Sequence, residues 1–153
     1  MRRLIWFLIL CLLAGPAVAA PSGAGAILVY SGTTGFRHDS IPAGIKAVSE
    51  MAARRGLSVV ASEDPVVFSS SSLKRFKAIV LLSCTTDPKK PASEWLVGDR
   101  RTALQQFVRS GGGIVAIHAA ADSHYHWPWY ARLIGGRFPP HPQGTANGHL
   151  SAV

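Results

Sequence analysis

Cysteine is scarce in this chain of 153 residues, which contains only Cys11 and Cys84. Cys11 lies in an N-terminal apolar segment that we expect to be removed, so the mature protein would keep one thiol and could form no internal disulfide. The fold must therefore be held together by its core. Apolar residues make up 48% of the sequence, which is enough for one domain of ordinary size.

Long hydrophobic runs are also missing. The apolar stretch at residues 4–13 is too short for a transmembrane helix, which needs about 20 residues. Arg2 and Arg3 precede this stretch, and Ala17 and Ala19 follow it at the spacing of a cleavage site. We expect residues 1–20 to be a signal peptide and residues 21–153 to form the exported domain, periplasmic or extracellular, with no stable membrane span after cleavage. A retained membrane anchor is the alternative.

A concentrated basic patch is lacking although the chain is basic. Without Arg2 and Arg3, the 16 Lys and Arg residues fall to 14 against 8 acids, which leaves a net charge of +6. These cations are scattered in pairs and are not interleaved with aromatic residues. We therefore predict a solvated basic surface and no nucleic-acid binding. A glycine signature for phosphate binding is absent too, so no nucleotide cofactor is expected.

Strand-like apolar runs alternate with helix signals along the chain. We predict strands at residues 26–31, 57–61, 78–82 and 114–117, and a fifth that begins near residue 149. Helices are predicted to begin near Asp39 and Ser40, to form a short turn at 72–76, to run from an Asp99 cap to Gly111, and to cover 127–134. This alternation predicts a three-layer α/β fold with a parallel sheet.

Polar residues gather directly after three of these strands, at residues 33–39, 85–87 and 118–126. The segment 83–99 is long for a connection in such a fold, which makes it a candidate for function. Ligands of open parallel sheets bind beyond the carboxyl ends of the strands, so we predict one shared site there. The hydroxyls of Thr85 and Thr86 could contribute to it, whereas we interpret Cys84 as a small core residue.

His118 stands at the turn that follows the fourth predicted strand. Small residues, Ala116 and Ala120, flank it two positions before and two positions after. Such spacing permits a sharp turn from strand to helix that pushes the middle side chain into solvent, as in a nucleophile elbow. The side chain presented here is an imidazole, which can accept and donate protons near neutral pH.

Three motifs in order carry a resemblance: GFRHDSIPAG at 35–44, GGGIVAIHAAAD at 111–122 and YHWPWYARLIGGRFPPHP at 125–142. With them the chain resembles the ThuA-like, or trehalose utilisation, family. The resemblance implies a flavodoxin-like sheet similar to that of class I glutamine amidotransferases, and a role in catabolism of trehalose or related disaccharides through keto-sugars. The amidotransferases hold a catalytic Cys at the elbow, and His118 cannot form a thioester, so their activity is not expected. Family domains usually run further, so the sheet looks incomplete at its C-terminus.

His118, His38 and Asp122 are the predicted catalytic residues. We assign His118 as the acid/base and His38, which follows the first strand, as its partner. Asp122 would orient an imidazole. The alternatives are a His118 that satisfies backbone groups of its loop, a His38–Asp39 segment that caps the first helix, and an Asp122 placed to match a helix dipole.

The predicted substrate contacts combine a guanidinium, a phenol and imidazoles suited to sugar hydroxyls: Arg37, Tyr125, His126 and His141. Trp127 and Trp129 could also stack on a sugar, although core packing is the favoured interpretation of this pair. The nearby histidines could hold a divalent metal, but their spacing matches no metal signature, so no metal or other cofactor is predicted.

The leading hypothesis is an exported carbohydrate-active protein that transfers protons next to a sugar carbonyl or hydrolyses an oxidised sugar, as a hydrolase or lyase. The alternative is a non-catalytic sugar-binding or assembly module that accompanies an exported sugar oxidoreductase. The expected partner is a small carbohydrate, and a homo-oligomer is compatible with the sequence.

Overall fold

A computed structural model describes residues 25–138, 149 and 151. The predicted signal peptide and His141 lie outside the described residues, and so does most of the fifth strand predicted near residue 149.

Four strands form one parallel sheet in the order β2-β1-β3-β4. They are β1 (Ala26–Tyr30), β2 (Ser58–Ser62), β3 (Phe76–Leu82) and β4 (Gly113–Ile117). β1 pairs with both β2 and β3, and β3 pairs with β4. The predicted α/β fold with a parallel sheet is confirmed, and this strand order is that of a flavodoxin-like sheet.

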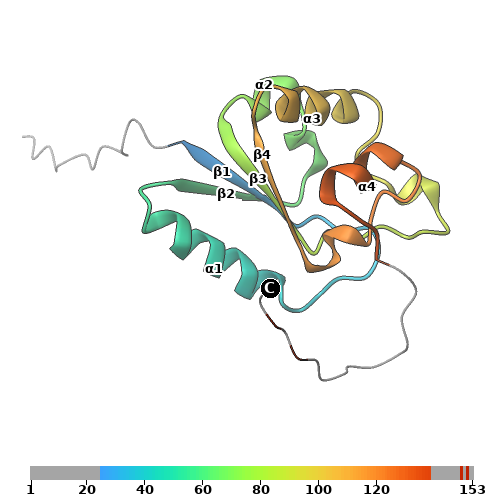
Figure 1. Cartoon of the computed structure of the whole chain (residues 1–153), viewed down its shortest axis with the longest axis horizontal. Helices are drawn as coiled ribbons and strands as arrows, with labels where there is room; N and C mark the ends of the chain where they lie inside the picture. The colour runs from blue at the N-terminus through green and yellow to red at the C-terminus, as the bar shows by residue number, and fades with distance from the viewer. Residues whose placement is uncertain (1–24, 139–148, 150, 152–153) are drawn as a thin grey trace, which may run out of the picture.

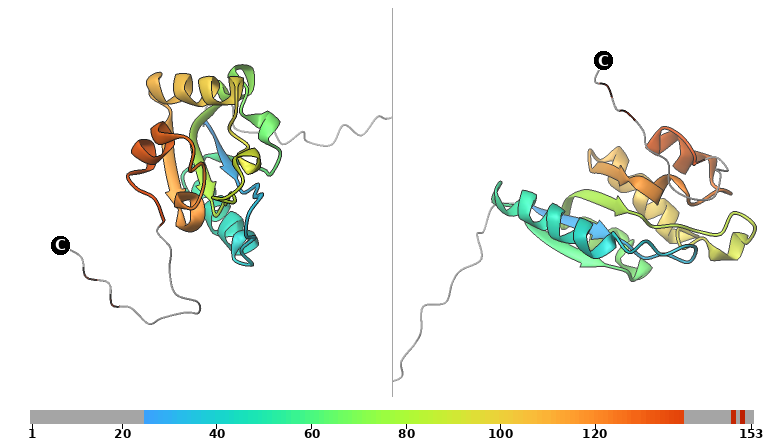
Figure 2. Two further views of the ribbon diagram at one scale, coloured as in Figure 1. Left: turned by 90° about the vertical axis from the view of Figure 1, so that its right-hand side faces the viewer. Right: turned by 90° about the horizontal axis from the view of Figure 1, so that it is seen from below.

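Helices cover both faces of the sheet, which gives the three predicted layers (Figures 1 and 2). One face carries α1 (Ile41–Ala53), and the other carries α2 (Ser70–Leu73), α3 (Asp99–Arg109) and α4 (Pro128–Ile134). Short 3-10 turns lie at Pro65–Val67, Pro91–Ser93 and His118–Ala121. The left view of Figure 2 shows α3 and α1 on opposite sides of the strands.

The alternation of side chains along β1 and β3 divides the apolar residues between two clusters. Leu28, Ile79 and Leu81 point to the larger cluster beneath α2, α3 and α4, together with Leu104 of α3. Val29, Val80 and Leu82 point to the smaller cluster beneath Val48 of α1. The two central strands are buried on both faces, which is why their sequences are continuous apolar runs.

β4 is an edge strand among the described residues, since it pairs with β3 alone. Its Val115 side chain is 49% exposed and lines a shallow apolar groove against Met51 of α1, which is 44% exposed. Apolar side chains are therefore exposed along this edge of the sheet in the described part of the chain.

Two local predictions were wrong. Asp99 does not cap α3: the residue before the helix is Gly98, with φ of 52°, and Asp99 is the first helical residue, where its charge matches the helix dipole. The chain after β4 forms a 3-10 turn, not the opening turns of a helix that such an elbow predicts, and Asp122 terminates that 3-10 turn. The helix stop at Gly111 is confirmed by its φ of 90°.

No helix in the described ranges is both long enough and apolar enough to cross a membrane.

Candidate functional site

The segments that follow β1, β3 and β4 are joined by backbone hydrogen bonds at the carboxyl ends of the strands. The N–H groups of Thr34 and Gly35 donate to the Thr85 carbonyl, at 3.0 and 3.2 Å. The next residue, Thr86, donates its N–H to the Asp122 carbonyl at 3.1 Å. The three polar segments predicted from the sequence therefore lie against one another, with the β3 segment in the middle.

His118 occupies the sharp turn directly after β4. Its φ of 53° lies in the left-handed region, which is unfavourable for a residue with a Cβ atom. The side chain is exposed, whereas Ala119 and Ala120 behind it are buried. Ala120 is fully buried, and its carbonyl accepts a hydrogen bond from the Tyr130 hydroxyl at 2.9 Å, so a larger side chain would not fit easily. The predicted elbow geometry is present.

The ring of His38 packs against the ring of His118. Their centroids are 4.6 Å apart with an interplanar angle of 62°, and Phe36 covers the other side of His38 at 4.9 Å. Burial of the His38 ring and the neighbouring charge of His118 lower the pKa of His38, while Asp122 and Asp39 oppose this shift. His38 is therefore favoured in its neutral form near neutral pH, beside an exposed imidazole.

Threonine hydroxyls fix the loop that carries His38. The Thr85 hydroxyl donates to the Phe36 carbonyl at 2.5 Å and also contacts the hydroxyl of Thr33 at 2.5 Å. A Cβ atom on Gly35 would lie 3.0 Å from the Thr85 hydroxyl oxygen, so only glycine fits comfortably between the two loops. Thr85 and Thr86 are buried and internally bonded, which places their hydroxyls in the framework of the site and away from a ligand.

Within the described residues, the Asp122 carboxylate is hydrogen-bonded to Tyr125 and not to His38 or His118. The Tyr125 hydroxyl donates to Asp122 Oδ1. Partial burial and the Asp122 carboxylate raise the pKa of Tyr125 to about 12, so its hydroxyl keeps its proton. The guanidinium of Arg137 lies over the Tyr125 ring, 5.3 Å from its centroid. Asp122 acts on His38 through its charge, whereas its hydrogen bond orients Tyr125.

Arg37 faces a carboxylate of its own chain. Its two terminal nitrogens donate to Glu63, at 2.7 and 3.1 Å, and both side chains are about half exposed. This bidentate pair lowers the pKa of Glu63, chiefly through the hydrogen bond, although partial burial opposes it. A ligand that uses Arg37 would have to share or replace Glu63.

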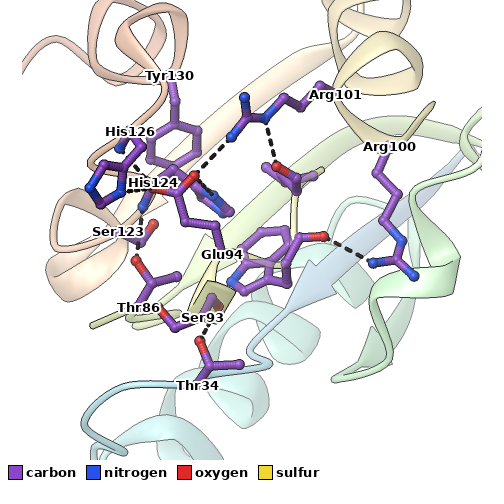
Figure 3. Close-up of polar contacts among 12 residues, drawn as sticks. Thr34, Thr86, Ser93, Glu94, Arg100, Arg101, Ser123, His124, His126 and Tyr130 are labelled. Carbon is purple, nitrogen blue, oxygen red and sulfur yellow. Dashed lines mark hydrogen bonds and ion pairs between the residues drawn. The ribbon is translucent and has the colours of Figure 1, made fainter. Parts of the chain in front are cut away.

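His126 is held by Glu94, a residue that the sequence interpretation missed (Figure 3). The Glu94 side chain is only 2% exposed, and Oε1 accepts from both the backbone N–H and the ring Nδ1 of His126, at 2.7 and 3.0 Å. Arg101 donates to the other oxygen at 2.8 Å. The long segment 83–99 was the one signal available, because nothing in the local sequence shows that Glu94 is buried.

His124 belongs to the core. Its ring is fully buried among Trp95, Tyr130 and Trp127, with centroids 4.4, 4.8 and 6.3 Å away. Neither ring nitrogen forms a hydrogen bond within the described residues, and Nδ1 lies 3.8 Å from Glu94 Oε2. Burial lowers the pKa of His124 to about 4, even though the Glu94 carboxylate opposes the shift. Trp127 is also buried and stacks on Trp129 at 4.9 Å, which supports its interpretation as a core residue.

The histidines do not converge on one point in the described residues. His118 pairs with His38. The Nδ1 atoms of the buried His124 and the partly exposed His126 lie 3.8 and 3.0 Å from Glu94. Within residues 25–138, 149 and 151, no three His, Cys, Asp or Glu side chains are grouped as metal ligands.

Comparison with known proteins gives two findings and one absence. The family model described as ThuA, trehalose utilisation, matches residues 26–152. A solved structure, that of a ThuA-like protein from Bacteroides uniformis, is similar with a TM-score of 0.55 and 23% sequence identity. The similarity covers 79% of this chain and 48% of that one, so the chain spans about half the length of this structural relative. A search of curated proteins gives no significant match.

The strained turn at His118 predicts an unusual order of stability. We expect His118→Gly to be more stable than His118→Ala by roughly 0.5–1 kcal/mol, because glycine adopts a positive φ without steric cost. Urea unfolding of the two variants measures the difference. Ala116→Gly is the matched control in extended β4, where glycine should instead destabilise; the same order at both positions would contradict a strained turn.

The buried His124 predicts a loss of stability in mild acid. Its folded-state pKa of about 4 lies below the ordinary 6.5, so the unfolded chain binds a proton more readily. The free energy of unfolding should therefore fall as the pH drops from 6.5 towards 4, by up to about 3 kcal/mol. Urea unfolding across this range should show the fall in the wild type and a smaller one in His124→Phe and His124→Leu. Equal pH dependence in all three would refute a neutral buried imidazole.

Proposed function

Because the chain belongs to the ThuA, or trehalose utilisation, family, we propose that it acts on a disaccharide or an oxidised sugar derived from one, by acid–base chemistry at His118 and His38. The observation that carries this proposal is the direct packing of the two imidazoles, 4.6 Å between centroids, at the carboxyl ends of β1 and β4. The rings come from separate loops, one bonded to Thr85 and the other to Thr86 after β3.

Burial of the His38 ring and the charge of a protonated His118 both disfavour protonation of His38. The proposed working state is a neutral His38 beside a protonated His118. In that state one histidine can accept a proton from a substrate carbon or hydroxyl while the other donates one to a sugar oxygen. One ring gains a proton and the other loses one, so an elimination or isomerisation of the sugar balances without a protein nucleophile.

The surrounding residues suit a polar, hydroxyl-rich ligand. Tyr125 keeps its proton and is oriented by Asp122, so it presents a partly exposed aromatic ring beside the site segments. Arg137 lies over that ring and adds positive charge. These groups would bind the sugar, while the histidine pair would perform the proton transfers.

Removal of either imidazole should abolish most of the activity. With trehalose and its keto derivatives as substrates, we expect His118→Ala and His38→Ala each to lower kcat/KM by about 10²–10⁴-fold, the usual contribution of a positioned acid or base. Lys46→Ala is the control, because Lys46 is exposed on α1 and pairs only with Glu50. Turnover by both histidine variants at the wild-type rate would exclude the mechanism. If the wild-type protein binds these sugars in calorimetry but does not turn them over, the sugar-binding module would be favoured.

The pH dependence should follow the lowered pKa of His38. If neutral His38 is the base, the acidic limb of the kcat/KM profile should lie below the ordinary histidine value of 6.5. Because the His118 charge contributes to the shift, His118→Asn should raise the pKa of His38, which NMR titration of the ring measures directly. Burial remains in this variant, so the return towards 6.5 should be partial. An unchanged His38 titration would show that the rings are not coupled.

A further inference from the structure

Glu94 is a buried carboxylate that accepts more hydrogen bonds than are needed to tie two loops together. It sits just after the 3-10 turn Pro91–Ser93, and its oxygens receive three donors from two other segments (Figure 3). Arg101, in the first turns of α3, binds Oε2 and also lies over the Trp127 ring, 5.0 Å from its centroid. His126 supplies the other two donors, its backbone N–H and its ring.

The charge of Glu94 fixes the tautomer of His126. Burial by itself would raise the pKa of Glu94, but the backbone and ring bonds from His126 and the charge of Arg101 outweigh it, so the pKa is lowered and the side chain is ionised at neutral pH. An ionised carboxylate can only accept hydrogen bonds. Nδ1 of His126, 3.0 Å from Oε1, must therefore carry the proton. In the neutral ring Nε2 is then the unprotonated nitrogen.

The unprotonated nitrogen is accessible to a ligand. The His126 side chain is 45% exposed, and no described residue forms a hydrogen bond with its Nε2. The neighbour Tyr125 belongs to the set of groups that we assign to sugar binding. His126 also lies in the segment after β4 that begins with His118.

We propose that Glu94 is a positioning residue that holds His126 in the Nδ1–H tautomer, so that Nε2 accepts a hydrogen bond from a hydroxyl group of a bound carbohydrate. The arrangement resembles the carboxylate–imidazole pair of a catalytic triad in its logic, because a buried acid sets the tautomer and the angle of an exposed ring. The tautomer rests on the contact between Glu94 and Nδ1 and on the ionised carboxylate, whereas the carbohydrate as ligand rests on the proposed function.

If the Glu94–His126 bond only tied the segment before α3 to the segment before α4, substitutions of His126 would have different effects. A purely structural bond requires the Nδ1 donor but does not involve Nε2. Two amide substitutions separate these roles, since the amide nitrogen of Asn occupies the place of Nδ1 and the amide of Gln reaches the place of Nε2. His126→Asn should keep the bond to Glu94 and lose the exposed acceptor. His126→Gln should keep an acceptor and weaken the bond to Glu94.

The first measurement is the tautomer itself. In the ¹⁵N-labelled full chain at alkaline pH, ring nitrogen shifts of His126 should show Nδ1–H in the wild type and a mixture of tautomers in Glu94→Gln. An Nε2–H ring in the wild type would overturn the proposal without any assumption about a ligand.

The second measurement is binding, with trehalose as the probe in calorimetry. We expect His126→Asn to unfold at the wild-type temperature and to bind trehalose about 2–10-fold more weakly, the effect of one hydrogen bond. His126→Gln should retain more of the affinity despite lower stability. If His126→Asn binds trehalose with wild-type affinity, the Glu94–His126 pair only ties the two segments together and the acceptor role of Nε2 is wrong. The proposed function would then still rest on His118 and His38. A wild type that binds neither trehalose nor its keto derivatives would overturn the proposed function and the acceptor role together, and the tautomer measurement would still decide what Glu94 does.

Discussion

The backbone of Thr85 and Thr86 is the connection on which the candidate site depends. These two residues follow the central strand β3, so they lie between the segments after β1 and β4. The Thr85 carbonyl receives two N–H groups from the β1 segment, and the Thr86 N–H and hydroxyl bind the β4 segment. In an open parallel sheet the loops at the carboxyl ends are otherwise independent of one another. Here both loops are hydrogen-bonded to the end of β3, which brings His38 and His118 into contact.

Two titratable side chains, His124 and Glu94, are buried near the same end of the sheet. His124 has no hydrogen-bond partner for its ring and survives in the core as a neutral group, surrounded by aromatic side chains. Glu94 survives as a charge because Arg101 and His126 bind both of its oxygens. Burial of unpaired polar groups is costly, so these arrangements reduce stability relative to an apolar core. Natural proteins usually tolerate such costs near sites whose geometry they hold in place.

The fold and the elbow could be predicted because both depend on local patterns. Continuous apolar runs at β1 and β3 indicate strands buried on both faces, and the structure buries them so. Small residues around His118 indicate a sharp turn, and its φ of 53° agrees. The end of α3 at Gly111 was equally readable. The sequence was ambiguous where one side chain can take either of two roles. Asp99 could cap α3 or begin it, and it begins it. Asp122 could bond to an imidazole or to another donor, and its partner is Tyr125.

The sequence by itself determined which residues form the sheet, the order of its polar loops and the imidazole that stands at the turn after β4. These features follow from backbone sterics and from the period of apolar side chains, which act over a few residues. Only the tertiary structure decided that Glu94 would hold His126, that Arg37 would face Glu63, and that His124 would be sealed in the core while His118 is exposed. His124 and His126 lie two residues apart in the sequence, yet one is buried and the other exposed, because burial is set by segments that meet only after the chain has folded.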